Sequence, residues 1–402
     1  GYHGSHIRTP QLDRLADEGL RLEQFYAMPT CTPTRVGLIT GKYPSRFGVL
    51  SPAYGRIFDD SIATLPRVLS SVGYTTAISG KWHMGSPPEF TPLRYGFDIS
   101  YGYFHGQVDP YTHIYKTGVP TWHRNDRYVE EQGHVTDLIT AEAVRVIREE
   151  ATDHPLFLYV AYSVPHYPLE EPETWTQMYE NVEPVSRRWY EASVSHMDAG
   201  IGEILQAIRE SRNAENTFVA FMSDNGGQRE WESQTEYNWS YAEKPHTVLG
   251  VNRPLCVWKG GLYDGGIRVP AVIRFPGGIK PGILNEPFHV VDWMPTLCAL
   301  VGIEARPDWD GANMLDRITS ADSRPSSPPS ERHLYWKTPR GVAVRVSDWK
   351  LILTRDSGKP ELYDLANDPL EEHDLASEEP DRVESLRNLL QEIAEQDIER
   401  SE

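Results

Sequence analysis

The chain is poor in cysteine and contains no long apolar run. Its 402 residues include three cysteines, Cys31, Cys256 and Cys298. Three thiols are too few for a disulfide-stabilised scaffold, and their spacing does not match a structural zinc site. No stretch reaches the roughly 18 apolar residues that a membrane-spanning helix needs. We therefore expect no membrane span, and we expect Cys256 and Cys298 to be buried thiols.

Positive charge is also scarce. The sequence has 39 Lys and Arg against 58 Asp and Glu, which gives a formal net charge of -19. Nucleic acid is bound by clustered Lys and Arg, so this composition argues against a nucleic-acid partner. An anionic substrate would need a local pocket of cationic side chains.

Composition and pattern indicate a folded α/β enzyme. Hydrophobic residues make up 39% of the chain and aromatic residues 11%, as in globular proteins. Short β-rich runs alternate with amphipathic helices, which predicts a large mixed, mostly parallel sheet sandwiched by helices. We expect this domain to span residues 1–316 and a Ser- and Pro-rich linker to span 317–332. A small α+β subdomain would follow at 333–402, with strands near 342–345 and 351–354 and a helix near 380–396.

Polar side chains follow three predicted strands. The strands are 75–79, 156–162 and 217–222, and they are followed respectively by Lys81 and His83, by His166, and by Asp224 and Asn225. In open α/β sheets ligands bind beyond the carboxyl ends of the strands, so these side chains are expected to converge on one crevice. An apolar stripe also predicts a helix over 187–210, with Ser186 as its N-cap.

Several motifs occur in the order that one enzyme family shows. Cys31–Arg35 places a cysteine, a proline and an arginine at alternate positions. In this motif and in those that follow, the chain resembles the formylglycine-dependent sulfatases of the alkaline phosphatase superfamily. The resemblance implies an alkaline-phosphatase-like fold and sulfuric ester hydrolysis. The other matching segments are 9–16, 38–44, 80–85, 224–227, 259–270 and 361–369.

The resemblance also implies a specific nucleophile. In the family a maturation enzyme oxidises the motif cysteine, here Cys31, to formylglycine. One hydroxyl of the hydrated aldehyde attacks sulfur, and the other then expels sulfate. An unmodified thiolate would form a stable thiosulfate with no easy exit.

Cationic groups must compensate the charge of the transferred sulfuryl group. Arg35 lies one helical turn beyond the nucleophile and is expected to hold its oxygens. Lys81 and Lys259 are the candidate sulfate ligands. The resemblance assigns His83 as the base for the second hydroxyl. It assigns His166, with Lys259, as the acid near the leaving oxygen. His166 lies between two prolines, and a plain loop residue is the alternative.

A divalent metal is expected as the cofactor. Asp224 and Asn225 offer the hard oxygen ligands that suit Ca²⁺ or Mg²⁺, and the modified Cys31 would add an oxygen. A turn is the alternative for this Asp-Asn-Gly-Gly segment.

The chain departs from the family pattern in two places. Family members begin with an apolar strand that ends in two metal-binding aspartates, whereas this sequence starts at Gly1 with the residues that normally follow them. If the chain is complete, we expect weak metal affinity, little turnover and exposed sheet edges; a trimmed sequence of an ordinary sulfatase is the reading we favour. Cys256 also stands where members often carry an arginine, so substrate selectivity is expected to differ.

Within the family, the segments 94–98, 101–103, 111–113 and 156–161 resemble the arylsulfatase B group of N-acetylgalactosamine-4-sulfatases. This resemblance suggests a sulfated glycan or aryl sulfate as substrate, with Trp122 and Trp175 stacking on sugar rings. Family members are usually lysosomal, periplasmic or secreted. Two rival functions stay open: a phosphoester or phosphonate hydrolase of the same superfamily, and an inactive glycan-binding pseudosulfatase.

Overall fold

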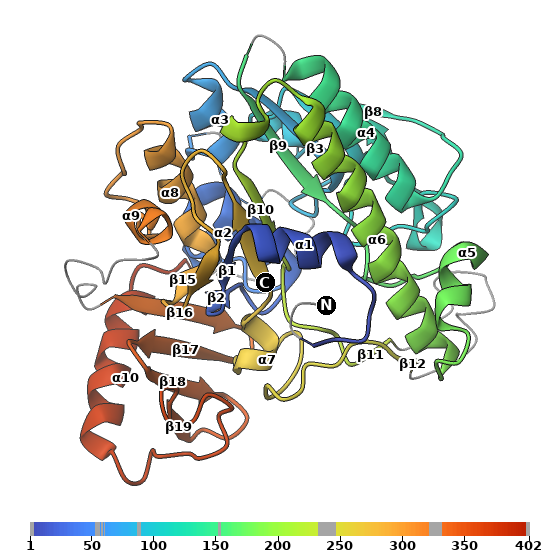
Figure 1. Ribbon diagram of the computed structural model, residues 1–402. Helices are drawn as coiled ribbons and strands as arrows, with labels where there is room; N and C mark the ends of the chain where they lie inside the picture. The colour runs from blue at the N-terminus through green and yellow to red at the C-terminus, as the bar shows by residue number, and fades with distance from the viewer. Residues whose placement is uncertain are drawn as a thin grey trace.

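A computed structural model describes residues 4–52, 57, 59, 61–86, 90–151, 154–231, 247–320 and 332–398 of the chain. Long apolar stripes form the two longest helices, and shorter helices connect the strands (Figure 1). The helices are α1 (Pro10–Glu18), α2 (Cys31–Thr40), α3 (Leu65–Ser70), α4 (Val135–Glu150), α5 (Glu173–Thr176), α6 (Val185–Glu210), α7 (Asp264–Ile267), α8 (Trp293–Leu300), α9 (Leu315–Thr319) and α10 (Pro380–Ala394).

The first sheet contains two of the predicted strands, β3 and, as its last strand, β9. Its strand order is β8-β7-β4-β3-β9. β3 pairs in parallel with β4 and with β9, while β7 pairs antiparallel with β4 and β8. The parallel register places the carboxyl ends of β3, β4 and β9 at one edge. The bounds are β3 (Thr75–Lys81), β4 (Ile99–Tyr103), β7 (Trp122–Arg124), β8 (Arg127–Tyr128) and β9 (Leu156–Ala161).

A second sheet has the order β10-β13-β1-β14. β13 pairs antiparallel with β10 and β1, and β14 pairs in parallel with β1. The architecture is therefore mixed, as expected, but parallel pairing within these two sheets is limited to β9–β3–β4 and β1–β14. The predicted α/β fold, a mixed sheet layer covered by helices, is confirmed. The bounds are β1 (Leu20–Leu22), β10 (Val219–Met222), β13 (Ala271–Arg274) and β14 (Gly282–Leu284).

A large cavity separates the two sheets. Over the described residues, β9 pairs only with β3, and β10 pairs only with β13. Apolar side chains of both strands line a cavity of about 1590 Å³. Its polar end contains Asp224 and Lys259, beyond the carboxyl ends of the strands. The cavity therefore leads from the interior of the sheet layer to the predicted site.

Helices cover both sides of the strands. α4 and α6 pack side by side, and α4 also contacts β3 and β9 (Figure 1). The helix predicted over 187–210 is confirmed, with its start at Val185. The predicted N-cap was wrong, because Pro184 holds the N-cap position and Ser186 is buried within the first turn. None of the helices in the described part of the chain is long and apolar enough to cross a membrane.

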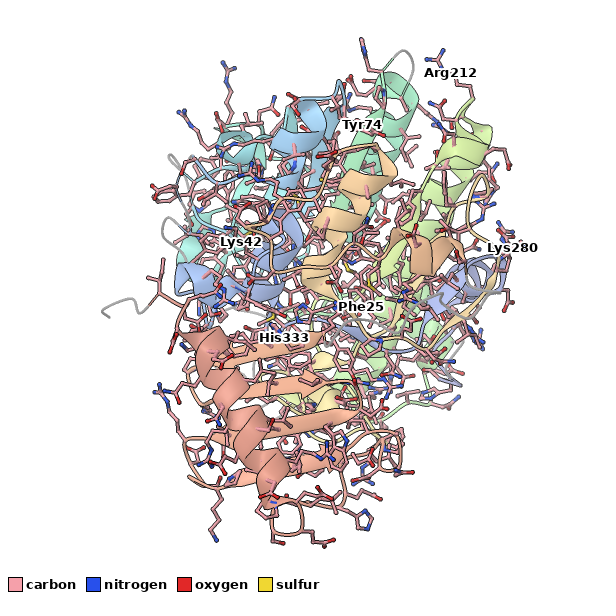
Figure 2. All side chains as sticks on the ribbon, turned by 90° about the vertical axis from the view of Figure 1, so that its left-hand side faces the viewer. Phe25, Lys42, Tyr74, Arg212, Lys280 and His333 are labelled. Carbon is pink, nitrogen blue, oxygen red and sulfur yellow. The ribbon has the colours of Figure 1, made fainter. Side chains whose placement is uncertain are left out.

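An antiparallel sheet forms the C-terminal part, with the order β16-β17-β18-β19. α10 lies across its strands, and His333 marks the junction with the rest of the molecule (Figure 2). The two predicted strands are confirmed as β17 and β18, and β16 and β19 were missed. Residues 321–331 of the expected linker lie outside the described residues. The bounds are β16 (His333–Thr338), β17 (Gly341–Val346), β18 (Trp349–Thr354) and β19 (Pro360–Asp364).

Three two-stranded ladders complete the part of the fold that the structure describes. β2 pairs in parallel with β15, whereas β5 with β6 and β11 with β12 pair antiparallel. Their bounds are β2 (Phe25–Tyr26), β5 (Ile114–Tyr115), β6 (Val119–Pro120), β11 (Glu230–Trp231), β12 (Thr247–Val248) and β15 (Phe288–His289).

A buried ion cluster attaches the C-terminal sheet to α7. Nζ of Lys350 in β18 lies 2.9 Å from Oδ1 of Asp264 and 2.6 Å from Oε1 of Glu371. The other carboxylate oxygen of Glu371 accepts a hydrogen bond from the backbone N–H of Asp264 at 2.7 Å. All three side chains are almost completely buried. Arg268 lies 3.6 Å from the other oxygen of Asp264, so removal of the lysine would affect the buried Glu371 most.

Candidate active site

The candidate nucleophile occupies the first residue of α2. Thr30 has an extended backbone, so the helix begins at Cys31, and the helix ends at Gly41 in the left-handed conformation at φ 67°. Cys31 is buried, with an exposed fraction of 2%. Its Sγ atom lies 3.2 Å from Nδ1 of His83. A helix N-terminus favours negative charge, so this position suits an anionic or oxygen-rich nucleophile.

Arg35 holds the ends of two strands beside the nucleophile. Its Nη1 donates to the backbone oxygen of Lys81 at 2.7 Å and to the hydroxyl of Tyr159 at 3.1 Å. Its Nη2 lies 2.9 Å from Oδ2 of Asp224. The guanidinium therefore links β3, β9 and the loop after β10 in one plane of donors.

The end of β3 supplies Lys81 and His83. Gly80 has φ 117°, and a Cβ there would lie 2.0 Å from the oxygen of Ala161, so glycine is required for β3 and β9 to approach. Burial, together with the positive charges of Arg35 and Lys259, lowers the pKa of Lys81 to about 8. Burial and the charge of Lys81 also lower the pKa of His83 well below its usual value. A neutral His83 can accept a proton.

Asp224 and Asn225 follow β10. The hydroxyl of Thr34 donates to the backbone oxygen of Asp224 at 2.6 Å, which ties this loop to α2. Burial alone would raise the pKa of Asp224, but the charges of Arg35, Lys81 and Lys259 outweigh burial and lower it to about 2. The carboxylate is therefore ionised at neutral pH.

Lys259 and His166 complete the group. The backbone N–H of Lys259 donates to the oxygen of Gly227 at 3.1 Å. Both side chains line the cavity that also contains Arg35, Lys81 and Asp224. Burial and the charges of Lys259 and Lys81 lower the pKa of His166 well below its usual value. The structure thus brings together the predicted site residues from α2, from the segments that follow β3, β9 and β10, and, for Lys259, from the loop before α7.

The donor set suits a hard cation. Oδ1 of Asn225 is buried and has no hydrogen-bond partner among the described residues, and it lies next to the ionised carboxylate of Asp224. Oxygen ligands of this kind fit Ca²⁺ or Mg²⁺, although two side chains cannot fill a shell of ~6–8 oxygens. Two other groups of possible ligands occur in the described part of the chain: His134, Glu171 and His196, and Asp368, Glu372 and His373.

Some sequence expectations need correction. Trp122 is only 2% exposed and packs against Tyr101 and Tyr103, so it cannot stack on a sugar. Trp175 stacks on the ring of His196, with centroids 4.9 Å apart. Cys256 was expected to be buried, but it is partly exposed, whereas Cys298 is buried as expected.

Sequence reasoning missed several residues around the nucleophile. Tyr159 bonds to Arg35, and Gly106 lies against the imidazole of His83. Tyr159 is an apolar-pattern residue of a buried strand, so no signal in the pattern distinguished it. Gly106 lies in a loop, and only the three-dimensional contact shows why a side chain cannot be accommodated there.

The fold and this buried cationic site are typical of a hydrolase of anionic esters. The candidate nucleophile lies at a helix N-terminus, and cationic side chains that could bind the ester oxygens surround it. The profile of the Sulfatase family matches residues 1–303, and that of the C-terminal part of N-sulphoglucosamine sulphohydrolase matches residues 258–399. The chain is 30% identical to arylsulfatase J of Mus musculus, over 96% of this chain and 72% of that protein. The chain belongs to the sulfatase family and is a sulfuric ester hydrolase.

The chain is also similar to other curated proteins and to solved structures. The chain is 32% identical to human N-acetylgalactosamine-6-sulfatase, over 79% of this chain and 62% of that protein. It therefore spans less than two thirds of this relative. A crystal structure described as Ps i-CgsB in complex with k-i-k-neocarrahexaose superposes with a TM-score of 0.86 at 27% identity, covering 100% of this chain and 90% of the other. A phosphonate monoester hydrolase of Agrobacterium radiobacter shares the fold at 18% identity and a TM-score of 0.68.

Replacement of Gly106 by alanine is expected to lower kcat for a sulfate ester by about 10-fold or more, because the new Cβ would lie 2.4 Å from Nε2 of His83 and displace the ring. The matched control is Gly282→Ala, where the Cβ meets only Leu20 at an ordinary 3.7 Å. Steady-state kinetics and thermal unfolding of both variants make the test. An unchanged kcat in Gly106→Ala would contradict a role of His83 in the reaction.

Proposed function

We propose that the chain hydrolyses sulfate esters of a sulfated glycan through a formylglycine formed from Cys31 with a divalent metal. One observation carries the proposal: the buried Cys31 lies at a helix N-terminus, 3.2 Å from His83. Arg35 bridges from the same helix to Asp224 at 2.9 Å. This arrangement surrounds one nucleophilic position with a base, cations and a carboxylate.

The residues divide the reaction between them. Arg35 orients the oxygens of the hydrated nucleophile, and Lys81 and Lys259 bind the sulfate oxygens. Lys259 protonates the leaving alcohol beside His166, since the lowered pKa of His166 leaves that imidazole neutral in the free site. His83 removes the proton from the remaining hydroxyl so that sulfate departs. The lowered pKa of His83 keeps that imidazole neutral and ready to accept the proton.

Asp224, Asn225 and the modified residue at position 31 would hold the metal. When bound, Ca²⁺ or Mg²⁺ supplies positive charge that stabilises the anionic sulfuryl group. The buried Oδ1 of Asn225, which has no hydrogen-bond partner among the described residues, supports this assignment. The positive charges of Arg35, Lys81 and Lys259 keep Asp224 ionised despite its burial.

A glycan is the substrate class that the relatives favour. N-acetylgalactosamine-6-sulfatase is named for a sulfated sugar, and the Ps i-CgsB structure is named for its complex with k-i-k-neocarrahexaose. The sequence resemblance to N-acetylgalactosamine-4-sulfatases points to the same class but to another sulfate position. The position of the sulfate on the sugar is therefore the first variable to scan.

The test compares matched esters after co-expression with a formylglycine-generating enzyme and addition of Ca²⁺. We expect release of inorganic sulfate from an aryl sulfate and from sulfated N-acetylgalactosamine, and much slower hydrolysis of the matching phosphate. Faster release of phosphate or of a phosphonate ester would instead assign the chain to the rival hydrolase class. Tight binding of a sulfated sugar without cleavage, by protein whose Cys31 is converted, would identify a pseudosulfatase.

A further inference from the structure

A histidine outside the candidate site contacts carboxylates with both ring nitrogens. His196 lies in the middle of α6 and is 3% exposed. Its Nδ1 lies 2.7 Å from Oε2 of Glu171, and its Nε2 lies 2.9 Å from Oδ1 of Asp137. Burial raises the pKa of Glu171, and the hydrogen bond with His196 opposes this shift. With both carboxylates ionised, they only accept hydrogen bonds, and the imidazole donates from both nitrogens and carries a positive charge.

The surroundings support this protonated form. Asp137 and His134 face His196 from α4, Glu171 faces it from the preceding loop, and Trp175 stacks on its ring. Burial alone would lower the pKa of His196, but the hydrogen bonds to the two carboxylates outweigh burial and raise it to about 9. His134 has a pKa lowered to about 4, chiefly by burial, and it stays neutral.

A metal ion fits this cluster less well than a proton does. Nδ1 of His134 accepts a hydrogen bond from the N–H of Thr136 at 3.2 Å. Its other nitrogen, Nε2, must therefore carry the hydrogen and donate to the oxygen of Glu170 at 3.0 Å. Neither nitrogen of His134 has a lone pair left for a metal, and both nitrogens of His196 are already engaged by carboxylates.

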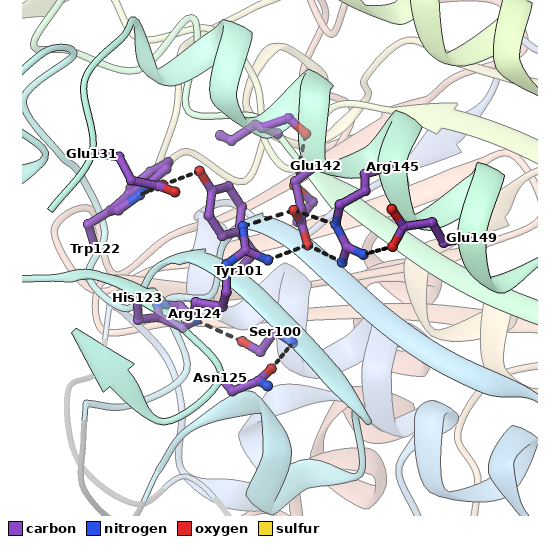
Figure 3. A network of polar contacts seen from close by, with 12 residues as sticks. Ser100, Tyr101, Trp122, His123, Arg124, Asn125, Glu131, Glu142, Arg145 and Glu149 are labelled. Atoms are coloured by element: carbon purple, nitrogen blue, oxygen red, sulfur yellow. Dashed lines mark hydrogen bonds and ion pairs between the residues drawn. The ribbon is translucent and has the colours of Figure 1, made fainter. Parts of the chain in front are cut away.

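The two helices form a fixed platform. α4 packs along α6 and is tied to the first sheet by Arg124, which contacts the carboxylate of Glu142 at 2.9 and 3.0 Å (Figure 3). Arg145 braces the same carboxylate from one turn along α4 (Figure 3). Asp137 and His196 therefore both belong to packed, braced helices.

Glu171 belongs to a segment of another kind. Residues 162–172 contain no helix or strand, and they carry His166 into the candidate site. Glu171 is the acidic side chain of this loop that reaches the helices, and it is only 1% exposed. Its contact with His196 is thus a buried, charge-assisted attachment between the loop and the platform.

We propose that protonated His196 is a positioning residue that anchors the 162–172 loop through Glu171 and so holds His166 over the site. This role rests on the proposed function, because His166 matters only if esters are cleaved there. Loss of the proton removes one donor and the positive charge, and this weakens the attachment at alkaline pH. The anchored form is thus present below the pKa of His196 and is lost as the pH rises through it.

The test compares Glu171→Ala with Asp137→Ala, because each variant removes one carboxylate from His196 but only Glu171 lies on the loop. For Glu171→Ala we expect kcat at pH 7 to fall by about 10-fold or more with KM little changed, and Glu171→Gln to recover part of the loss. For Asp137→Ala we expect kcat within about twofold of the wild type at pH 7, with the alkaline decline of kcat moved to lower pH.

Hydrogen exchange gives a readout that does not need turnover. We expect faster amide exchange across 162–172 in Glu171→Ala but not in Asp137→Ala. If exchange is faster in Glu171→Ala but the wild-type protein cleaves no sulfate ester, the proposed function is contradicted and the anchoring role is supported. Three results would overturn the proposal. The two substitutions could have equal effects, or Glu171→Ala could keep the kcat and the amide exchange of the wild type. The protein could also bind one equivalent of Zn²⁺ and lose it in both variants.

Discussion

Replacement of Cys31 by alanine is expected to lower kcat/KM for a sulfate ester by about 10⁴-fold or more, because it removes the proposed nucleophile outright. The side chain is buried and small, so alanine leaves a minor cavity and the fold should persist. Steady-state kinetics with an aryl sulfate, on protein produced with the maturation enzyme, provide the measurement. Circular dichroism and thermal unfolding establish that the variant is folded.

Cys298→Ala is the matched control. This thiol is also buried, but it lies in α8 and packs with Leu65 and Met294, away from the candidate site. We expect the control to keep wild-type kcat/KM. Comparable activity in Cys31→Ala and Cys298→Ala would show that the cysteine is not the nucleophile and would favour the rival hydrolase class.

Lys350→Met is expected to reduce the free energy of unfolding by about 3–5 kcal/mol, the usual cost of removing one partner from a buried ion group. Its ammonium lies within 2.9 Å of Asp264 and 2.6 Å of Glu371, and methionine would take the ammonium away from the buried Glu371, while Asp264 keeps Arg268 at 3.6 Å. Because this cluster attaches β18 to α7, the C-terminal sheet should loosen first. Denaturant unfolding measures the loss.

Lys337→Met serves as the control for this substitution. Nζ of Lys337 lies 2.9 Å from Asp397, but Arg46 contacts the same carboxylate at 2.8 Å, so Asp397 keeps a cationic partner. The lysine side chain is 19% exposed. We expect a loss of about 1 kcal/mol or less. If Lys350→Met were no more destabilising than Lys337→Met, the ion cluster would not be what attaches the C-terminal sheet.

Much of the site could be predicted because its parts follow strands. Lys81 follows the predicted strand 75–79, and Asp224 follows the predicted strand 217–222. Residues that follow the strands of an α/β sheet are expected at one edge of that sheet. The order of the motifs then predicted the sulfatase family and identified Cys31 as the candidate nucleophile. The contacts of Arg35 with Lys81, Tyr159 and Asp224 show why these motifs occur together.

Other features depend on contacts between distant segments. The sequence pattern could not show that Trp122 is covered by Tyr101, nor that His196 meets Glu171 and Asp137. The antiparallel pairing of β13 with β1 likewise joins residues that lie far apart in sequence. Local propensity determines that a segment is a strand, whereas the neighbours in space determine its direction.

The most direct test of the proposed chemistry is the mass of the tryptic peptide 22–35, which contains Cys31, taken from protein made with a formylglycine-generating enzyme. We predict a peptide about 18 Da lighter than the thiol form, because oxidation of the thiol to an aldehyde exchanges sulfur for oxygen and removes two hydrogens. An unmodified thiol under these conditions would contradict the proposed nucleophile.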